Sequence, residues 1–292
     1  MGNPLPSPVS VAWLHEHLGD ENLVVIDATN HLPIPTDGPY VPESGAETYR
    51  PEHIPGALFA DLLVAFADPD SPEDWTAPDH ERFAAAAGTL GIGDGATVVV
   101  YDQHGGFWAT RFWWHLRYEG FDQVTTLDGG LPAWKAAGYE VTDVVPEPNP
   151  RTFTGTRRPE LFRSTEDVAA SLDDENTVLV NVLDEPAYRG DVKNFARRGH
   201  IPGSINLPVS TLRDPETGAP RPIEELRREF EAAGLMDSGR KVVTYCGGGI
   251  AATGVAHALA LAGRDDVAVY DGSMTAWAGN PDLPLVTGDS PR

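Results

Sequence analysis

The chain has 292 residues, enough for two domains of roughly 150 residues each, and its 41% of hydrophobic residues can fill packed cores. Its formal net charge is −23, from 21 basic and 44 acidic residues. Nucleic acids and anionic membrane surfaces both attract basic proteins, so this charge argues against either as a partner. The one cysteine cannot form an internal disulfide, and the first residues lack the basic and apolar stretches of a signal peptide. We therefore expect a cytoplasmic protein.

The first half of the chain alternates predicted helices with short apolar strands. Ser10 is a suitable N-cap for a first helix, and runs of β-branched residues bounded by turn residues predict strands. The expected helices lie at 11–18, near 79–90 and near 108–118, and the expected strands lie at 23–28, 97–101 and 124–127.

The second half shows the same alternation. Its first helix is expected after Ser164, where Ser-Thr-Glu-Asp resembles a capping box. Further strands are expected at 177–182, 241–245 and 267–270, and further helices near 222–233 and 251–261. Apolar strands that alternate with helices predict an α/β fold, with a mainly parallel sheet flanked by helices in each half.

Three short motifs occur twice, in the same order and at a nearly constant spacing, which predicts a duplicated domain. The pairs are His53-Ile-Pro-Gly56 and His200-Ile-Pro-Gly203, Val98-Val-Val-Tyr101 and Val242-Val-Thr-Tyr245, and Asp128-Gly-Gly130 and Asp271-Gly-Ser273. Because the two histidines occupy matching turns, a structural role is expected for both. We place the first domain at 1–143, a stiff proline-rich linker at 144–160 and the second domain at 161–292.

The single cysteine, Cys246, stands where the strand at 241–245 gives way to a helix. The next three residues are glycines, which let the backbone turn tightly and aim several N–H groups at one point. Such amides, together with a helix N-terminus, favour an anion, so the sulfur is predicted to react as a thiolate. The alternative is a buried free cysteine that packs as a small hydrophobic residue. Reactive sites of parallel sheets lie beyond the carboxyl ends of strands, which is where Cys246 is expected.

These features together resemble a tandem-domain rhodanese sulfurtransferase. The resemblance rests on the cysteine at a strand end, the His-Ile-Pro-Gly turns, the Asp-Gly-Ser motif with Trp277 after it, and a first half that has Asp102 in place of the cysteine. It implies two tandem rhodanese-like domains, of which the first is catalytically inactive. It also implies an enzyme that moves sulfane sulfur from a small anionic donor such as thiosulfate to cyanide or a thiol, through a persulfide on Cys246.

The resemblance further implies which residues form the active loop. Backbone amides of the loop are expected to bind the substrate, and neither a cofactor nor a metal is expected. The loop consists of Cys246, Gly247, Gly248, Gly249, Ile250 and Ala251.

Two departures from the family pattern leave the sulfur donor open. An expected Asp-x-Arg appears here as Asn181-Val-Leu183, so the substrate-binding arginine is missing at Leu183. Arg189, within Tyr-Arg-Gly, matches a second arginine of mercaptopyruvate-type relatives and is the first candidate for the anion contact; a solvated surface arginine is the alternative. The loop itself is closer in shape to that of the 3-mercaptopyruvate enzymes but lacks their hydroxyls. Donors of both kinds therefore remain candidates.

Two other classes of function are alternatives to this reading. A cysteine-dependent phosphatase or arsenate reductase needs Cys-x5-Arg, with the arginine clamping the oxyanion, but the corresponding residue here is Ala252. This departure argues strongly against that class. A sulfur carrier or regulatory binding module without turnover remains open, because the substrate arginine is absent.

Overall fold

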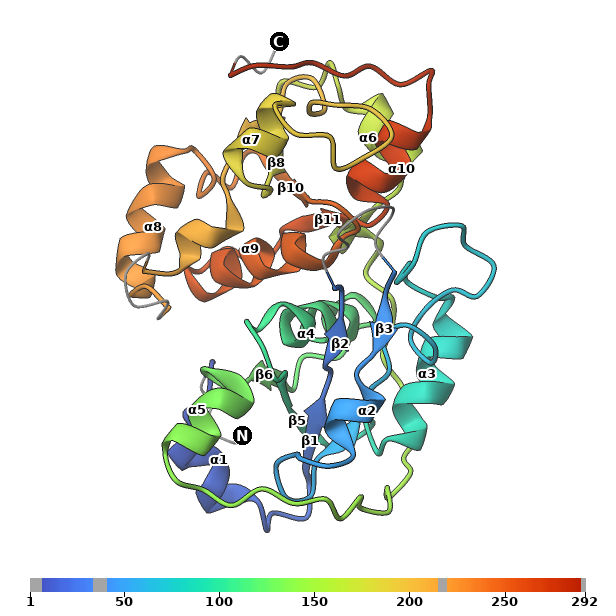
Figure 1. Cartoon of the computed structure of the whole chain (residues 1–292), viewed down its shortest axis with the longest axis vertical. Coiled ribbons are helices and arrows are strands. Elements are labelled where there is room, and N and C mark those ends of the chain that lie inside the picture. Colours follow the sequence, from blue (N-terminus) through green and yellow to red (C-terminus); the bar gives the residue numbers. More distant parts are fainter. Residues whose placement is uncertain (1–6, 34–40, 215–219, 290–292) are drawn as a thin grey trace. The chain divides into compact units, whose positions relative to one another are not determined.

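The computed structural model describes residues 7–33, 41–214 and 220–289, and it forms two compact units, Met1–Arg158 and Pro159–Arg292 (Figure 1). The division between them falls within the stretch 144–160 that the sequence suggests as a linker. Residues 1–6, which bear on the expected lack of a signal peptide, lie outside the described part. None of the described helices has both the length and the apolar character needed to cross a membrane.

The first unit is built on a parallel four-stranded sheet in the order β4-β1-β5-β6. The strands are β1 Leu23–Asp27, β4 Leu58–Phe59, β5 Thr97–Tyr101 and β6 Val124–Thr126, and a small antiparallel pair consists of β2 Asn30–His31 and β3 Glu43–Ser44. The helices are α1 Val11–His17, α2 Ala46–Tyr49, α3 His80–Thr89, α4 Phe107–Tyr118 and α5 Gly130–Ala136.

The second unit has a parallel five-stranded sheet in the order β7-β11-β10-β8-β9. Its strands are β7 Phe162–Arg163, β8 Thr177–Asn181, β9 Ile205–Asn206, β10 Lys241–Tyr245 and β11 Ala268–Tyr270. Its α-helices are α6 Thr165–Ala170, α7 Glu185–Arg189, α8 Ile223–Ala232, α9 Ile250–Leu261 and α10 Ser273–Gly279, with short 3₁₀ turns at Pro159–Leu161 and Val209–Leu212. The expectation of an α/β fold with mainly parallel sheets is confirmed.

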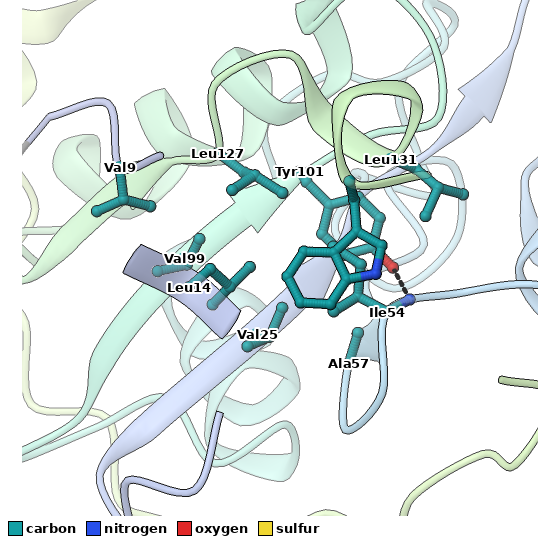
Figure 2. Close-up of a cluster of buried hydrophobic side chains, with 10 residues drawn as sticks. Val9, Leu14, Val25, Ile54, Ala57, Val99, Tyr101, Leu127 and Leu131 are labelled. Atoms are coloured by element: carbon teal, nitrogen blue, oxygen red, sulfur yellow. Dashed lines mark hydrogen bonds between the residues drawn. The ribbon is translucent and has the colours of Figure 1, made fainter. Parts of the chain in front are cut away.

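Alternate residues of the central strands fill two different cores, as the pleat of a strand requires. Val99 and Tyr101 of β5 pack with Leu14 of α1 and Trp134 of α5 in the buried cluster drawn in Figure 2. Their neighbours along β5 are also buried, and α4 packs against this strand and β6. The sheet is therefore covered on both faces, which explains why its strands are apolar along their whole length.

A tyrosine at the end of each central strand holds the His-Ile-Pro-Gly turn against the sheet. The Tyr101 hydroxyl accepts a hydrogen bond from the Ile54 N–H at 3.1 Å, as drawn in Figure 2. In the second unit the Tyr245 hydroxyl accepts one from the Ile201 N–H at 3.2 Å. The histidines of both turns are buried and contact backbone carbonyls, which agrees with their expected structural role.

Two helix starts carry the capping signals that the sequence predicted. The Ser10 side chain accepts a hydrogen bond from the Trp13 N–H, and Ser164 forms a complete capping box with Asp167. The long elements agree with the sequence expectations to within one residue at each end. The elements that the sequence did not indicate are short, such as the two-residue strands β4, β7 and β9 and the helices α2 and α7.

The segment 151–158 packs along the first unit. The Arg151 N–H donates to the Gly88 carbonyl at 2.9 Å and the Arg158 N–H donates to the Tyr118 carbonyl at 2.7 Å. Arg157 forms an ion pair with the buried Glu119 at the end of α4. One turn earlier in α4 lies His115, which is buried and has no hydrogen-bond partner at either ring nitrogen among the described residues.

The burial of His115 predicts a pH dependence of stability. Burial, with the nearby charges of Arg111 and Arg157, holds the pKa of this imidazole well below its ordinary value of 6.5. Below pH 6.5 the His115 imidazole therefore binds a proton in the unfolded chain but stays neutral in the folded chain. The free energy of unfolding should fall as the pH drops below 6.5, by up to about 1.4 kcal/mol per pH unit. His115→Leu should remove this part of the pH dependence. Urea denaturation of the wild type and of His115→Leu at pH 7.5 and pH 5.5 tests this prediction. If both proteins lose the same unfolding free energy between the two pH values, the prediction is contradicted.

Candidate active site

Cys246 follows the last residue of the central strand β10 and precedes α9, as the sequence predicted. The strand lies between β8 and β11, so the cysteine stands at the carboxyl edge of the sheet. Its side chain is a free thiol with only 3% of the residue exposed. The turn into α9 is made by Gly249, whose φ of 77° lies in the left-handed region that glycine adopts without strain.

The start of α10 holds the cysteine loop in place through its backbone. The Ser273 hydroxyl accepts hydrogen bonds from the N–H groups of Cys246 and Gly249, each at 3.1 Å, and donates to the Tyr270 carbonyl at 2.8 Å. The Cys246 carbonyl accepts from the Met274 N–H at 3.0 Å. Ser273 is fully buried and has a φ of 47°, a conformation that costs energy for a residue with a side chain.

Thr275 adds a second contact to the same loop. Its N–H and its hydroxyl both donate to the Gly247 carbonyl, at 2.9 and 2.8 Å. With the contacts of Ser273 and Met274, the first turn of α10 therefore fixes the carbonyls at the start of the loop and two of its amides. The sequence showed the Asp-Gly-Ser motif but gave no sign that it contacts the cysteine loop, because that contact depends on the pairing of β10 with β11.

Several amides of the loop have no acceptor in the described part of the chain. They are the N–H groups of Gly247, Gly248, Ile250 and Ala251. The N–H groups of the first turn of a helix have no acceptor within the helix, and together with the helix dipole they favour an anion. The loop therefore offers hydrogen-bond donors close to the cysteine, at the residues that the sequence suggested.

In the first unit the equivalent loop binds a carboxylate through its backbone N–H groups. Asp102 follows β5 as Cys246 follows β10, and Gly106 has a φ of 87° before α4. One carboxylate oxygen of Asp102 accepts from the N–H groups of His104 and Gly106 at 2.9 and 3.0 Å. The other accepts from those of Trp108 and Ala109 at 3.0 and 3.1 Å. Four amides thus converge on one negative group.

The aromatic ring of Phe195 lies beside the cysteine loop. The Cζ atom of Phe195 lies 3.3 Å from the point that a Cβ atom on Gly247 would occupy. A side chain at position 247 would therefore press on the ring, whereas a Cβ at Gly248 would meet no atom within 4 Å and needs no left-handed φ. Phe195 lies in the stretch 190–199 that carries several basic residues, and sequence reasoning did not single it out.

The structure places the basic candidates in different surroundings. Arg189, the first candidate, ends α7 with its side chain 37% exposed and lies near three carboxylates: Asp289 at 2.6 Å, Asp191 at 3.2 Å and Glu185 at 3.7 Å. Arg197 donates to backbone carbonyls of Trp277, Ala278, Asn280 and Leu283, a set of contacts typical of a structural arginine. Leu183, at the missing arginine, packs against the core.

Comparison with known proteins identifies the family. The model of the rhodanese-like domain matches residues 10–137 and again residues 164–280. Thiosulfate/3-mercaptopyruvate sulfurtransferase 2 of Arabidopsis thaliana is 34% identical, over 97% of this chain and 87% of the relative. Human 3-mercaptopyruvate sulfurtransferase is 32% identical, over 92% of this chain and 91% of the relative.

A solved structure agrees with these sequence matches. The crystal structure of SseA from Escherichia coli, described as having the rhodanese fold, superposes with a TM-score of 0.78 at 31% identity and covers 91% of this chain and 98% of that one. The chain therefore belongs to the rhodanese family and is a transferase of the rhodanese type.

The contacts of Ser273 predict the effect of removing its hydroxyl. Ser273→Ala leaves two buried N–H groups without an acceptor, so we expect a loss of about 1–3 kcal/mol of unfolding free energy together with a clear loss of turnover. Ser164→Ala removes the capping box of α6 and is the matched control, with about 1 kcal/mol lost but turnover kept. Urea denaturation and steady-state rates measure both. Full turnover in Ser273→Ala would show that the loop needs no such support.

Proposed function

We propose that this protein transfers sulfane sulfur from a donor such as thiosulfate to a thiophilic acceptor, either cyanide or a thiol, through a persulfide on Cys246. One observation carries the proposal. The cysteine sits at the edge of the sheet, beside loop amides that have no acceptor in the described structure, and the equivalent loop of the first unit gathers four amides around a carboxylate.

The proposed reaction consists of two displacements at sulfur. The Cys246 thiolate attacks the outer sulfur of thiosulfate, the S–S bond of the donor breaks, and sulfite leaves with the bonding electron pair. The new persulfide carries its negative charge on the terminal sulfur, where the amides of Gly248, Ile250 and Ala251 can stabilise it. Cyanide then attacks that sulfur, and thiocyanate leaves as the Cys246 thiolate is restored. Splitting one transfer into two steps is the general advantage of covalent catalysis.

A second candidate donor is 3-mercaptopyruvate. The Cys246 thiolate attacks the sulfur of 3-mercaptopyruvate, the C–S bond breaks, and the enolate of pyruvate leaves with the bonding electron pair. The proton of the donor thiol then moves to this enolate and completes the methyl group of pyruvate. The names of the Arabidopsis and human relatives support this donor. The loop also supports it, because Gly248 and its neighbours supply no cation that would favour a dianion such as thiosulfate. Rates with both donors, measured with cyanide in excess, decide which is preferred.

The proposal predicts that Cys246→Ser abolishes sulfur transfer without unfolding the chain. A serine hydroxyl is a poor nucleophile at neutral pH and cannot carry sulfane sulfur. Wild-type protein treated with donor alone should gain the mass of one sulfur atom on the peptide that contains Cys246, and the variant should gain none.

Two results would contradict this reading. Turnover retained in Cys246→Ser would exclude the cysteine as the nucleophile. A wild-type protein that gains sulfur but does not turn over with cyanide or thiols would instead be a sulfur carrier or regulatory module.

We also propose Arg189 as the contact for an anionic donor. Its support is the match to mercaptopyruvate-type relatives and its place in the second unit, but the carboxylates of Asp289, Asp191 and Glu185 already neutralise it. A donor anion must therefore displace Asp289, the nearest of the three, from the guanidinium. Because the donor and Asp289 compete for Arg189, removing one or the other side chain should change the KM for the donor in opposite directions.

Arg189→Ala should raise the KM for anionic donors roughly ten-fold or more, because a charged hydrogen bond contributes about 1.5–3 kcal/mol. Asp289→Asn should lower that KM, since it removes the nearest carboxylate that competes with the donor for the guanidinium. Steady-state kinetics at low and high salt measure both, and kcat should change less than KM. An unchanged KM in Arg189→Ala at low salt would place the contact elsewhere, with Lys193 and Arg198 as the next candidates.

We also propose that the two units descend from one duplicated domain and that the protein acts in the cytoplasm. The repeated motifs support descent of the two units from one duplicated domain, with the first unit having lost its cysteine. The single thiol must stay reduced to act, which fits the cytoplasm. Fractionation of cells with an antibody against the chain tests the compartment, and recovery in an oxidising compartment would refute it.

A further inference from the structure

Two histidines lie together at the edge of the first sheet that corresponds to the cysteine edge of the second. The central strands β1 and β5 are paired so that Asp27 lies opposite Tyr101 at their carboxyl ends. His31 comes four residues after the end of β1, and His104 three residues after the end of β5. The carboxyl edge of a parallel sheet is where ligands of such folds bind. The sulfur chemistry proposed for Cys246 makes no use of these two residues.

The two imidazole rings face each other through nitrogen atoms. His104 Nε2 lies 3.0 Å from His31 Nδ1, and the rings meet edge to face at 63°. The other nitrogen of His31, Nε2, lies 3.1 Å from the Thr48 hydroxyl oxygen. That hydroxyl donates its own proton to the Gly45 carbonyl, so it accepts a hydrogen bond from His31.

These contacts determine where the protons sit when both rings are neutral. His31 carries its proton on Nε2 and has a lone pair on Nδ1. His104 must then donate from Nε2 to that lone pair. Thr48 therefore orients His31 through the ring nitrogen that faces away from His104, which is the arrangement usual for metal-binding histidines.

Carboxylates lie near the pair. Glu43 is the partner of His31 across the β2–β3 pair, and the buried Asp27 ends β1 four residues before His31. Both act electrostatically on the His31 ring in the direction that favours positive charge. A cation placed between the two rings is therefore attracted by its surroundings.

We propose that His31 and His104 form a binding site for a divalent transition-metal ion that prefers nitrogen ligands, such as Zn²⁺. The ion takes the place of the proton between the two rings. It accepts the lone pairs of His31 Nδ1 and His104 Nε2, and the His104 proton moves to its Nδ1 through solvent. Two imidazoles bound at about 2.0–2.1 Å in a tetrahedral site have nitrogens about 3.3 Å apart, so the pair needs to open by only a few tenths of an ångström.

Water is expected to complete the coordination of the proposed ion. Among the residues described, no group of three or more histidine, cysteine or acidic side chains stands ready to hold a metal. The site is therefore a two-histidine site, and Glu43 joins only if its side chain rotates toward the ion. Such a site has moderate affinity and exchanges its ion readily, which suits a regulatory or stabilising ion.

The test is a titration of the full chain with Zn²⁺ alone, in competition with a chromophoric chelator. It uses the Cys246→Ser background, because this removes the only thiol. One bound ion is expected. His31→Gln or His104→Gln should weaken binding at least a hundred-fold, and Thr48→Val about ten-fold through loss of ring orientation. His15→Gln is the matched control, since His15 lies in the same unit but stacks on Tyr139, and it should change nothing.

A folding measurement accompanies the titration. Zn²⁺ should raise the melting temperature of the background protein but not that of the two histidine variants, because an ion stabilises only a fold that binds it. Affinity should also fall as pH drops into the range where imidazoles are protonated. Absence of binding in the background protein, binding unchanged by His31→Gln and His104→Gln, or an equal loss in His15→Gln would each overturn the proposal.

Discussion

Backbone N–H groups at the turn between a central strand and the next helix constrain both units of this protein. These donors cannot be satisfied within the helix, so each unit has to place a hydrogen-bond acceptor among them. The first unit does so permanently, with the Asp102 carboxylate on four amides. The second unit has a neutral serine on two of its amides and leaves others beside Cys246. The amides of the first loop are therefore occupied by a carboxylate, whereas the second loop keeps donors beside the cysteine, as the proposed persulfide requires.

The rigidity of the cysteine loop comes from elements far away in sequence. Ser273 can contact the loop only because α10 starts directly after β11, which pairs with β10. In the first unit the corresponding residue is Gly130, where a Cβ atom would lie 2.4 Å from the Asp102 carbonyl oxygen. The second unit accommodates a side chain at this place, at a φ of 47°. Strain at a functional site is tolerated when the surrounding structure holds it, and here it brings an acceptor to two buried amides.

The net charge of this protein is negative, whereas its cysteine loop presents hydrogen-bond donors that favour an anion. In the proposed reaction a chain with a net charge of −23 binds an anionic sulfur donor, which the field of the whole molecule repels. Fixed N–H dipoles of the cysteine loop would counter this repulsion locally, and they need no counterion. Three carboxylates lie around Arg189, so the proposed mechanism assigns most of the attraction at the loop to the amides rather than to a free cation.

The sequence by itself determined the long strands and helices, the cysteine at a strand end and the match to one family. Apolar runs, capping residues such as Ser164 and glycines such as Gly249 act through local physics, so they can be recognised without the fold. Only the tertiary structure revealed the two-residue strands, the contacts of Ser273 and Phe195 with the cysteine loop, the carboxylates around Arg189 and the facing histidines. Of the carboxylates around Arg189, Glu185 and Asp191 are close in sequence and only Asp289 is distant. The two-residue strands, the loop contacts and the facing histidines depend on which strand pairs with which, because pairing brings together side chains whose separation along the chain carries no local signal.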